Sequence, residues 1–304
     1  MDHRTQFTAT LRQALRGFVD ADHYRSHFPA SRIYPAFDPT QIETMALESF
    51  ELDPGRFLRH TEAMLRQCID AEQFLVEAIT GAAVVLGDWW ACDRLNYRSV
   101  ELGSERLLEL VYDIADERLR MGHGPSKPHK IVLSGPTGSR HTLGLAVTGE
   151  IFHWHGWNVL AGPNIAHDRL DELLRDEWVD VLGLSVADDR DIEGVGLTIS
   201  RCRQNSRNQS LRVMVGGPQA FLRPHLALEV GADGATTHAG QAQAMALAER
   251  EQAWGLPPSP FLSEARALWS RRLANGSYLC KRDPQGQWPA DCRNRVFLTP
   301  QDVG

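Results

Sequence analysis

The sequence lacks the marks of a membrane-spanning or secreted protein. No uninterrupted apolar run approaches the roughly 18 to 20 residues that cross a bilayer, and the polar start of residues 1–4 has no apolar core of a secretory signal. The five cysteines are odd in number and show no C-x-x-C spacing, which argues against a disulfide framework or a compact zinc site. We therefore expect a cytoplasmic protein with free thiols.

Positive charge is also scarce. The chain has 32 Lys and Arg against 39 Asp and Glu, a net charge of −7. Non-specific affinity for nucleic acid comes from phosphates neutralised by Lys and Arg, and no helix-turn-helix or winged-helix pattern is recognisable, so we expect no direct nucleic-acid binding. What is present is an ordinary globular composition, 42% hydrophobic and 23% charged, over 304 residues, a length that suggests two domains.

The N-terminal part of the chain has helical patterning. Residues 61–86 and 97–119 carry apolar residues three and four positions apart, which predicts two helices of a bundle. Between them, residues 87–90 (Gly-Asp-Trp-Trp) are expected to form a turn. Residues 121–130 combine Gly, Pro and Ser without periodicity, which predicts a linker. The expected domains are an N-terminal extension, partly helical, at 1–60, a helical bundle cap at 61–120, the linker at 121–130, an α/β domain at 131–252, and a tail of unknown role at 253–304.

Beyond the linker, short apolar runs alternate with amphipathic segments. The runs, each expected to be a buried strand, are residues 131–133, 159–161, 181–184 and 213–215. The segments expected to be helical are residues 143–154, 168–176, 193–204 and 219–230. This alternation predicts an α/β fold with a doubly wound parallel sheet. Ligands of such sheets bind at the loops that follow the carboxyl ends of the strands.

Those loops carry the residues with chemistry. A Gly-rich loop after the first strand ends in His141, and it contains neither a P-loop nor a dinucleotide fingerprint. A neutral imidazole at this place is a good ligand for cobalt, iron or zinc. The third strand ends at Ser185, the fourth at Gly216-Gly217, and residues 231–237 add another rim of small residues. Together these loops predict an elongated ligand slot.

The same loops resemble a known family. Residues 139–144 read Ser-Arg-His-Thr-Leu-Gly, residues 185–187 read Ser-Val-Ala, and residues 216–217 are Gly-Gly. This resembles the Asp-x-His-x-x-Gly, Ser-x-Leu and Gly-Gly signature of the cobalamin-binding domains of methionine synthase, corrinoid methyl carriers, mutases and light-dependent regulators. The resemblance implies a flavodoxin-like cobalamin-binding domain over about residues 130–249, with His141 as the lower axial ligand of cobalt. The cofactor-binding residues that it implies in this domain are Gly138, Ser139, Thr142, Gly144, Ser185, Ala187, Gly216, Gly217 and Thr236.

Two positions depart from that signature. Ala187 replaces the Leu, and Ser139 replaces the Asp that hydrogen-bonds the axial histidine in the family. A carboxylate beside a ligating imidazole raises its basicity and relays its proton, whereas a serine only orients the ring. The loss of the carboxylate favours binding and sensing over turnover.

The helical region carries a second resemblance. Residues 86–90, 95 and 104–107 are similar to the four-helix bundle that caps the upper face of cobalamin in methyl carriers and in CarH-type photoreceptors. The photoreceptors have Trp, nine residues, then Glu-His, and this chain has Trp90 followed by Val100-Glu101, so the upper-face histidine is missing. The resemblance implies that Trp90 and Glu101 lie near the upper face of the cofactor. A place for Trp90 in the bundle core remains an equal alternative.

Among the regulators, the chain is most similar to the AerR/PpaA group of cobalamin-binding antirepressors of photosynthetic bacteria. That resemblance implies a light-responsive, non-enzymatic transcription regulator whose partner is a repressor of the CrtJ/PpsR type, with hydroxo- or adenosylcobalamin as cofactor. An enzymatic alternative is a corrinoid methyl carrier of a methyltransferase system. A third alternative is a sensor on the same fold that binds haem, since His141 can also ligate iron.

Overall fold

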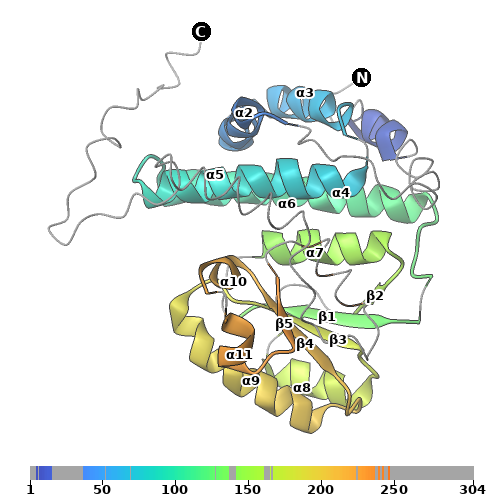
Figure 1. The fold of residues 1–304 in the computed structure, drawn as a ribbon. Coiled ribbons are helices and arrows are strands. Elements are labelled where there is room, and N and C mark those ends of the chain that lie inside the picture. The colour runs from blue at the N-terminus through green and yellow to red at the C-terminus, as the bar shows by residue number, and fades with distance from the viewer. Residues whose placement is uncertain are drawn as a thin grey trace, which may run out of the picture.

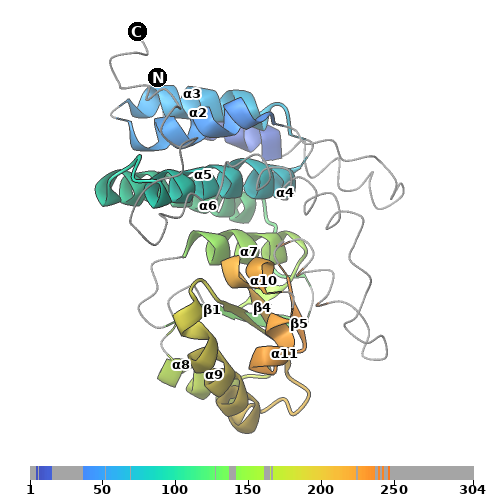
Figure 2. The same ribbon diagram turned by 60° about the vertical axis from the view of Figure 1, so that its left-hand side comes forward.

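The computed structural model describes residues 5, 7–15, 37–51, 53–68, 70–126, 128–136, 142–160, 165, 167–223, 225–236, 239, 242 and 246. In these residues a layer of helices lies over an α/β layer built on a five-stranded parallel sheet (Figures 1 and 2). The predicted fold class, a helical bundle cap followed by a doubly wound parallel sheet, is confirmed.

The helical layer is built from capped helices. Its elements are α2 (Pro39–Phe50), α3 (Pro54–Leu65), α4 (Ala71–Gln73), the π-helical η1 (Phe74–Ile79), α5 (Thr80–Ala91) and α6 (Tyr97–Arg120). The side chains of Asp38, Asp53 and Asn96 each accept a backbone hydrogen bond in the first turn of α2, α3 and α6, which satisfies N–H groups that would otherwise lack a partner.

Two expectations for this layer are wrong. Residues 61–86 are not one helix, because α3 ends at Leu65 and a new helix begins after Asp70, whose side chain accepts from the N–H of Gln73 at 2.6 Å. Residues 87–90 are not a turn, because they lie in the last turns of α5. The chain turns instead between Ala91 and Tyr97, where Asp93 has a left-handed φ of 54°.

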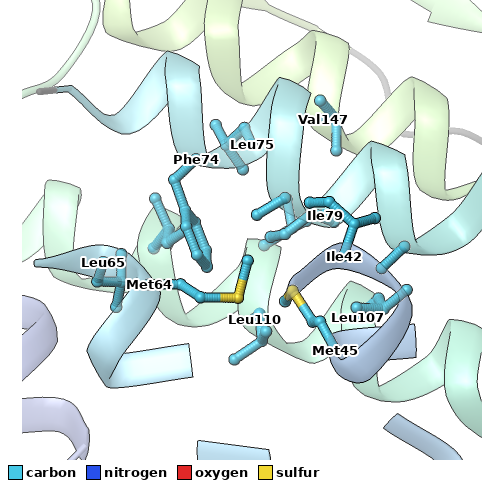
Figure 3. Packing of buried hydrophobic residues seen from close by; sticks show 14 of the residues in the cluster. Ile42, Met45, Met64, Leu65, Phe74, Leu75, Ile79, Leu107, Leu110 and Val147 are labelled. Atoms are coloured by element: carbon cyan, nitrogen blue, oxygen red, sulfur yellow. The ribbon is translucent and has the colours of Figure 1, made fainter. Parts of the chain in front are cut away.

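A shared apolar core holds the layer together. Figure 3 shows how Phe74, Leu75 and Ile79 of η1 point among side chains of the neighbouring helices. The labelled side chains of these neighbours are Ile42, Met45, Met64, Leu65, Leu107, Leu110 and Val147. The helix of α4, η1 and α5, residues 71–91, is also long and apolar enough to cross a membrane by length and composition alone, contrary to the expectation from the sequence. Its buried residues pack in this core.

The sheet has the order β2-β1-β3-β4-β5, with all strands parallel. Its strands are β1 (Lys130–Ser134), β2 (Asn158–Val159), β3 (Val181–Ser185), β4 (Arg212–Gly216) and β5 (Gly234–Ala235). The helices between them are α7 (Leu143–Trp154), α8 (His167–Asp176), the 3-10 turn η2 (Asp189–Asp191), α9 (Ile192–Asn205), α10 (Pro218–Leu222) and α11 (Leu226–Val230). The four predicted strands are confirmed, whereas residues 219–230 form two short helices instead of one, and β5 was not expected.

Helix α7 is the middle layer of the molecule (Figure 1). Its residues Val147 and Ile151 belong to the core of the helical bundle, and Leu145 and Phe152 belong to the core that lies against the sheet. The helix therefore contributes apolar side chains to both layers, and it sets how the bundle sits over the sheet.

Candidate functional site

The carboxyl ends of β3, β4 and β5 bring three of the predicted site residues together. Ser185, the last residue of β3, pairs with Gly216, the last residue of β4. The N–H of Val186 donates to the carbonyl of Gly216 at 2.8 Å, and the N–H of Thr236 donates to the carbonyl of Val215 at 3.0 Å. Ser185, Gly216 and Thr236 therefore lie together at the carboxyl ends of the strands.

Gly217 continues this edge, and only glycine fits there. Its φ is +91°, and a Cβ atom would lie 2.9 Å from the carbonyl oxygen of Val186 and 3.0 Å from Oγ of Ser185. Both the left-handed conformation and the lack of space exclude other residues. At Gly216 a Cβ would lie 3.2 Å from the carbonyl oxygen of Thr236. The two glycines thus allow the end of β4 and the loop after it to lie directly against the residues that follow β3 and β5.

The other predicted residues of the sheet domain lie at the same edge. Half-buried Ala187 follows Ser185 by two positions, and Thr142 immediately precedes α7. Gly144, in the first turn of α7, is exposed, and a Cβ built on it would meet no described atom within 4 Å. The predicted residues Gly138, Ser139 and His141 lie outside the described residues.

A cavity of about 150 Å³ opens between the carboxyl ends of β1 and β3. In the strand order found here, this is where successive connections leave the sheet in opposite directions, the usual ligand crevice of doubly wound folds. Its lining residues are Gly135, Pro136, Leu184, Ser185, Arg190, Asp191, Gly194, Val195 and Thr198. Pockets for drug-sized ligands have about 300 to 1,000 Å³, so this cavity can hold only part of a large ligand.

The charged wall of that cavity was not expected from the sequence. Arg190 forms an ion pair with Asp188 at 2.8 Å, which raises the pKa of Arg190 through the hydrogen bond and the nearby charge. Asp191 accepts from the N–H of Asp188 and closes a capping box at η2. The signal in the sequence was the run Asp188-Asp189-Arg190-Asp191 directly after the third strand.

The turn between α5 and α6 lies on the same side of the molecule as these strand ends. Helix α6 ends beside the start of β1, so its beginning lies toward the opposite, carboxyl edge of the sheet, as Figure 1 shows. Trp90, near the end of α5, is 51% exposed. Tyr97, which sequence reasoning missed, is 50% exposed, and its hydroxyl lies 3.1 Å from Oε1 of the exposed Glu101. Trp90 is therefore not a core residue of the bundle in this structure.

One buried polar atom at the edge lacks a partner. Gln219, in the first turn of α10, is 7% exposed, and its Oε1 has no hydrogen-bond partner among the described residues. Buried polar atoms are nearly always hydrogen-bonded in native proteins. An unpaired amide oxygen beside this edge fits a ligand that carries hydrogen-bond donors. Among the described residues, no three His, Cys, Asp or Glu side chains gather as they would around a metal ion.

Comparisons with known proteins identify the domain that carries this edge. Residues 129–248 match the B12 binding domain, which implies a cobalamin or corrinoid cofactor. The fold is similar to the monomethylamine corrinoid protein of Methanosarcina barkeri, at 14% identity and a TM-score of 0.54, over 70% of this chain and 97% of that one. The likeness takes in the helical layer as well as the sheet, since it extends over more of the chain than the B12 binding domain does.

Two further solved structures match more loosely. One is a novel cobalamin-binding protein from Desulfitobacterium hafniense DCB-2, with 18% identity, a TM-score of 0.36, and coverage of 67% of this chain and 96% of that one. The other is the methanol:cobalamin methyltransferase complex MtaBC from Methanosarcina barkeri, with 15% identity, a TM-score of 0.34, and coverage of 73% and 87%. No curated protein matches the chain.

Proposed function

We propose that the B12 binding domain at residues 129–248 holds a corrinoid across the carboxyl edge of the sheet, with the α5–α6 turn over its upper face. The observation that carries the proposal is the edge itself, where Ser185, Gly216 and Gly217 meet in a domain that matches B12 binding. The corrin ring would face these loops, and His141 would supply the lower ligand of the cobalt. This match favours a corrinoid over the haem alternative.

For the role of the bound corrinoid we propose methyl carriage between methyltransferases. The support is that the similarity to a monomethylamine corrinoid protein extends over nearly all of that protein, from its helical layer through its sheet. In the methyl carriers that the sequence resembles, a helical bundle caps the upper face of the corrinoid, and in this chain the helical layer would do so. The exposed Trp90 and Tyr97 lie at the place where such a partner would enter.

A second candidate is a light-responsive antirepressor of the AerR/PpaA type that acts on a CrtJ/PpsR-type repressor. The observation that favours it is Ser139, which stands where a carrier would hold the relay carboxylate. The net charge of −7 also suits a regulator that contacts a protein partner instead of DNA.

One set of experiments tests both steps of the proposal. Absorption spectra of the purified protein with and without hydroxocobalamin, in the dark and in light, report binding and photolysis, and His141→Ala should abolish stable retention. A methyl-transfer assay on the loaded protein then separates the two roles. Catalytic methyl transfer supports the carrier. Light-dependent recovery of a transcription factor from cell extract, without methyl transfer, supports the antirepressor and overturns the carrier.

A further inference from the structure

Gln219 is tied to the site by its backbone. It follows Gly217 by two residues, and its N–H donates to the carbonyl of Val186 at 3.1 Å. Val186 in turn donates to Gly216 and follows Ser185 directly. The glutamine therefore lies where the loops after β3 and β4 meet, at the edge that we propose for the corrinoid.

The unpaired atom of Gln219 is unfavourable in the protein alone. The residue is 7% exposed, and no described residue hydrogen-bonds its Oε1. A Met or Leu side chain of similar volume would fill the same space without a polar group. Leaving a buried acceptor without a donor costs about 1 to 3 kcal/mol. A glutamine at this position is explained if a donor from beyond the described residues reaches it.

We propose that Oε1 of Gln219 accepts a hydrogen bond from one of the primary carboxamides on the rim of the bound corrinoid. This inference depends on the proposed corrinoid site. A carboxamide N–H is a neutral donor, and the neutral amide oxygen of Gln219 is its natural acceptor. The bond forms only in the loaded protein, so Gln219 adds to affinity for the ligand at the expense of the stability of the ligand-free protein.

The proposal gives two effects of opposite sign for Gln219→Met. In the ligand-free protein the variant is at least as stable as the wild type toward urea, because an unpaired buried oxygen is removed. In absorption titrations it binds hydroxocobalamin about three- to tenfold more weakly, because it lacks one hydrogen bond to the ligand. Gln73→Met is the matched control, since Gln73 is also buried but its Nε2 donates to Glu77 at 3.1 Å. That control loses stability and keeps the wild-type affinity.

The ligand offers a second arm of the test. In the monocarboxylate derivatives of cobalamin, one carboxamide is replaced by a carboxylate, which accepts hydrogen bonds and does not donate them. For one derivative, the loss of affinity relative to unmodified cobalamin should be larger in the wild type than in Gln219→Met. That derivative identifies the carboxamide that contacts Gln219. Equal sensitivity of both proteins to every derivative would overturn the proposal.

The outcomes separate this inference from the proposed function. If the wild type fails to bind hydroxocobalamin, the corrinoid site and the role of Gln219 both fall. If the wild type binds and Gln219→Met binds equally well, or if the ligand-free variant is less stable than the wild type, only the role of Gln219 is overturned.

Discussion

Arg118 of α6 and Glu150 of α7 form a buried ion pair between the helical layer and the sheet domain. Nε of Arg118 lies 2.5 Å from Oε1 of Glu150, and the side chains are 2% and 3% exposed. Arg118 also donates to the carbonyl of His123, and Nδ1 of His153 lies 3.4 Å from the other oxygen of Glu150. The pair therefore links α6, the turn that follows it, and α7 at one buried point.

Removal of one partner of the Arg118–Glu150 pair should lower the free energy of unfolding. Arg118→Met leaves the Glu150 carboxylate buried without its main partner, which costs about 3 to 5 kcal/mol of unfolding free energy. The double variant with Glu150→Met should recover much of that loss, because two apolar side chains replace the pair. Urea unfolding measures both. A single variant that is no less stable than the double variant would show that the pair is not buried in solution.

Gly217→Ala should destabilise the protein by about 1 to 3 kcal/mol, because φ is +91° and the added Cβ meets the Val186 carbonyl at 2.9 Å. Affinity for hydroxocobalamin should fall as well, since the loop after β4 must move. Gly87→Ala is the control: Gly87 lies inside α5 with nothing near its Cβ position, so this change should raise stability by about 0.5 to 1 kcal/mol. Equal effects of the two changes in urea unfolding would contradict the loop geometry.

Trp90→Ala should alter cobalt chemistry more than binding. Trp90 is half exposed, so its loss removes little of the core, but in the proposed site it covers the upper face of the corrin. We expect faster exchange of the upper ligand or altered photolysis in stopped-flow and flash absorption measurements. Tyr112→Ala, a change at an equally exposed aromatic residue of α6 (53%), is the matched control. Unchanged rates for Trp90→Ala would remove Trp90 from the site.

The pair of Arg12 and Glu117 should make stability depend on pH. The hydrogen bond from Arg12, at 2.5 Å, and its charge lower the pKa of Glu117. The stabilisation is present above the ordinary pKa of glutamate and is lost as the pH falls through the lowered folded-state value. Arg12→Met should therefore lower Tm at neutral pH, and the difference from the wild type should shrink in acid. A difference in Tm that stays constant with pH would contradict this. Arg59→Met, at a pair with Asp53 that is exposed on both sides, should change Tm little at any pH.

Cys68 and Cys202 should resist alkylation in the folded protein. Burial raises the pKa of both thiols, that of Cys202 to about 12, and the nearby Asp171 adds to the effect at Cys202. Since the thiolate is the reactive form, iodoacetamide at neutral pH should label these two residues only after unfolding, as peptide mass spectrometry would show. Rapid labelling of either thiol in the native protein would contradict its burial.

The sequence predicted the sheet better than the helical layer for a physical reason. Buried parallel strands such as residues 181–184 are short continuous apolar runs, which few other structures share. In the bundle, residues 66–68 and 70 lie outside the helices and interrupt a pattern that reads as one helix. The sign of the break in the sequence is Asp70, three residues before Gln73. Gly87 and Asp88 predict a turn because both residues favour turns in isolation, but in the structure they lie within α5.

Some residues of the candidate site could be predicted from the sequence, and others could not. Ser185 and Gly216-Gly217 could be found because each follows a recognisable strand, and parallel strands bring their carboxyl ends together. Tyr97 and Gln219 could not, because their importance lies in exposure and in a missing hydrogen bond, which only three-dimensional packing reveals. Pro224 was a visible signal that residues 219–230 could not be one helix.

The widened turn of η1 sets the direction in which each later side chain of α5 points. There the N–H of Thr80 bonds the carbonyl of Leu75, five residues back instead of four, so the segment holds one residue more than an α-helix of equal length. Each residue turns a helix by about 100°. Loss of a single residue between Phe74 and Ile79 would therefore rotate Ala82, Val85 and Leu86 out of the core and swing Trp90 away from the carboxyl edge. A substitution in this segment changes only local packing, whereas a change in its length would rotate every later residue of α5 about the helix axis.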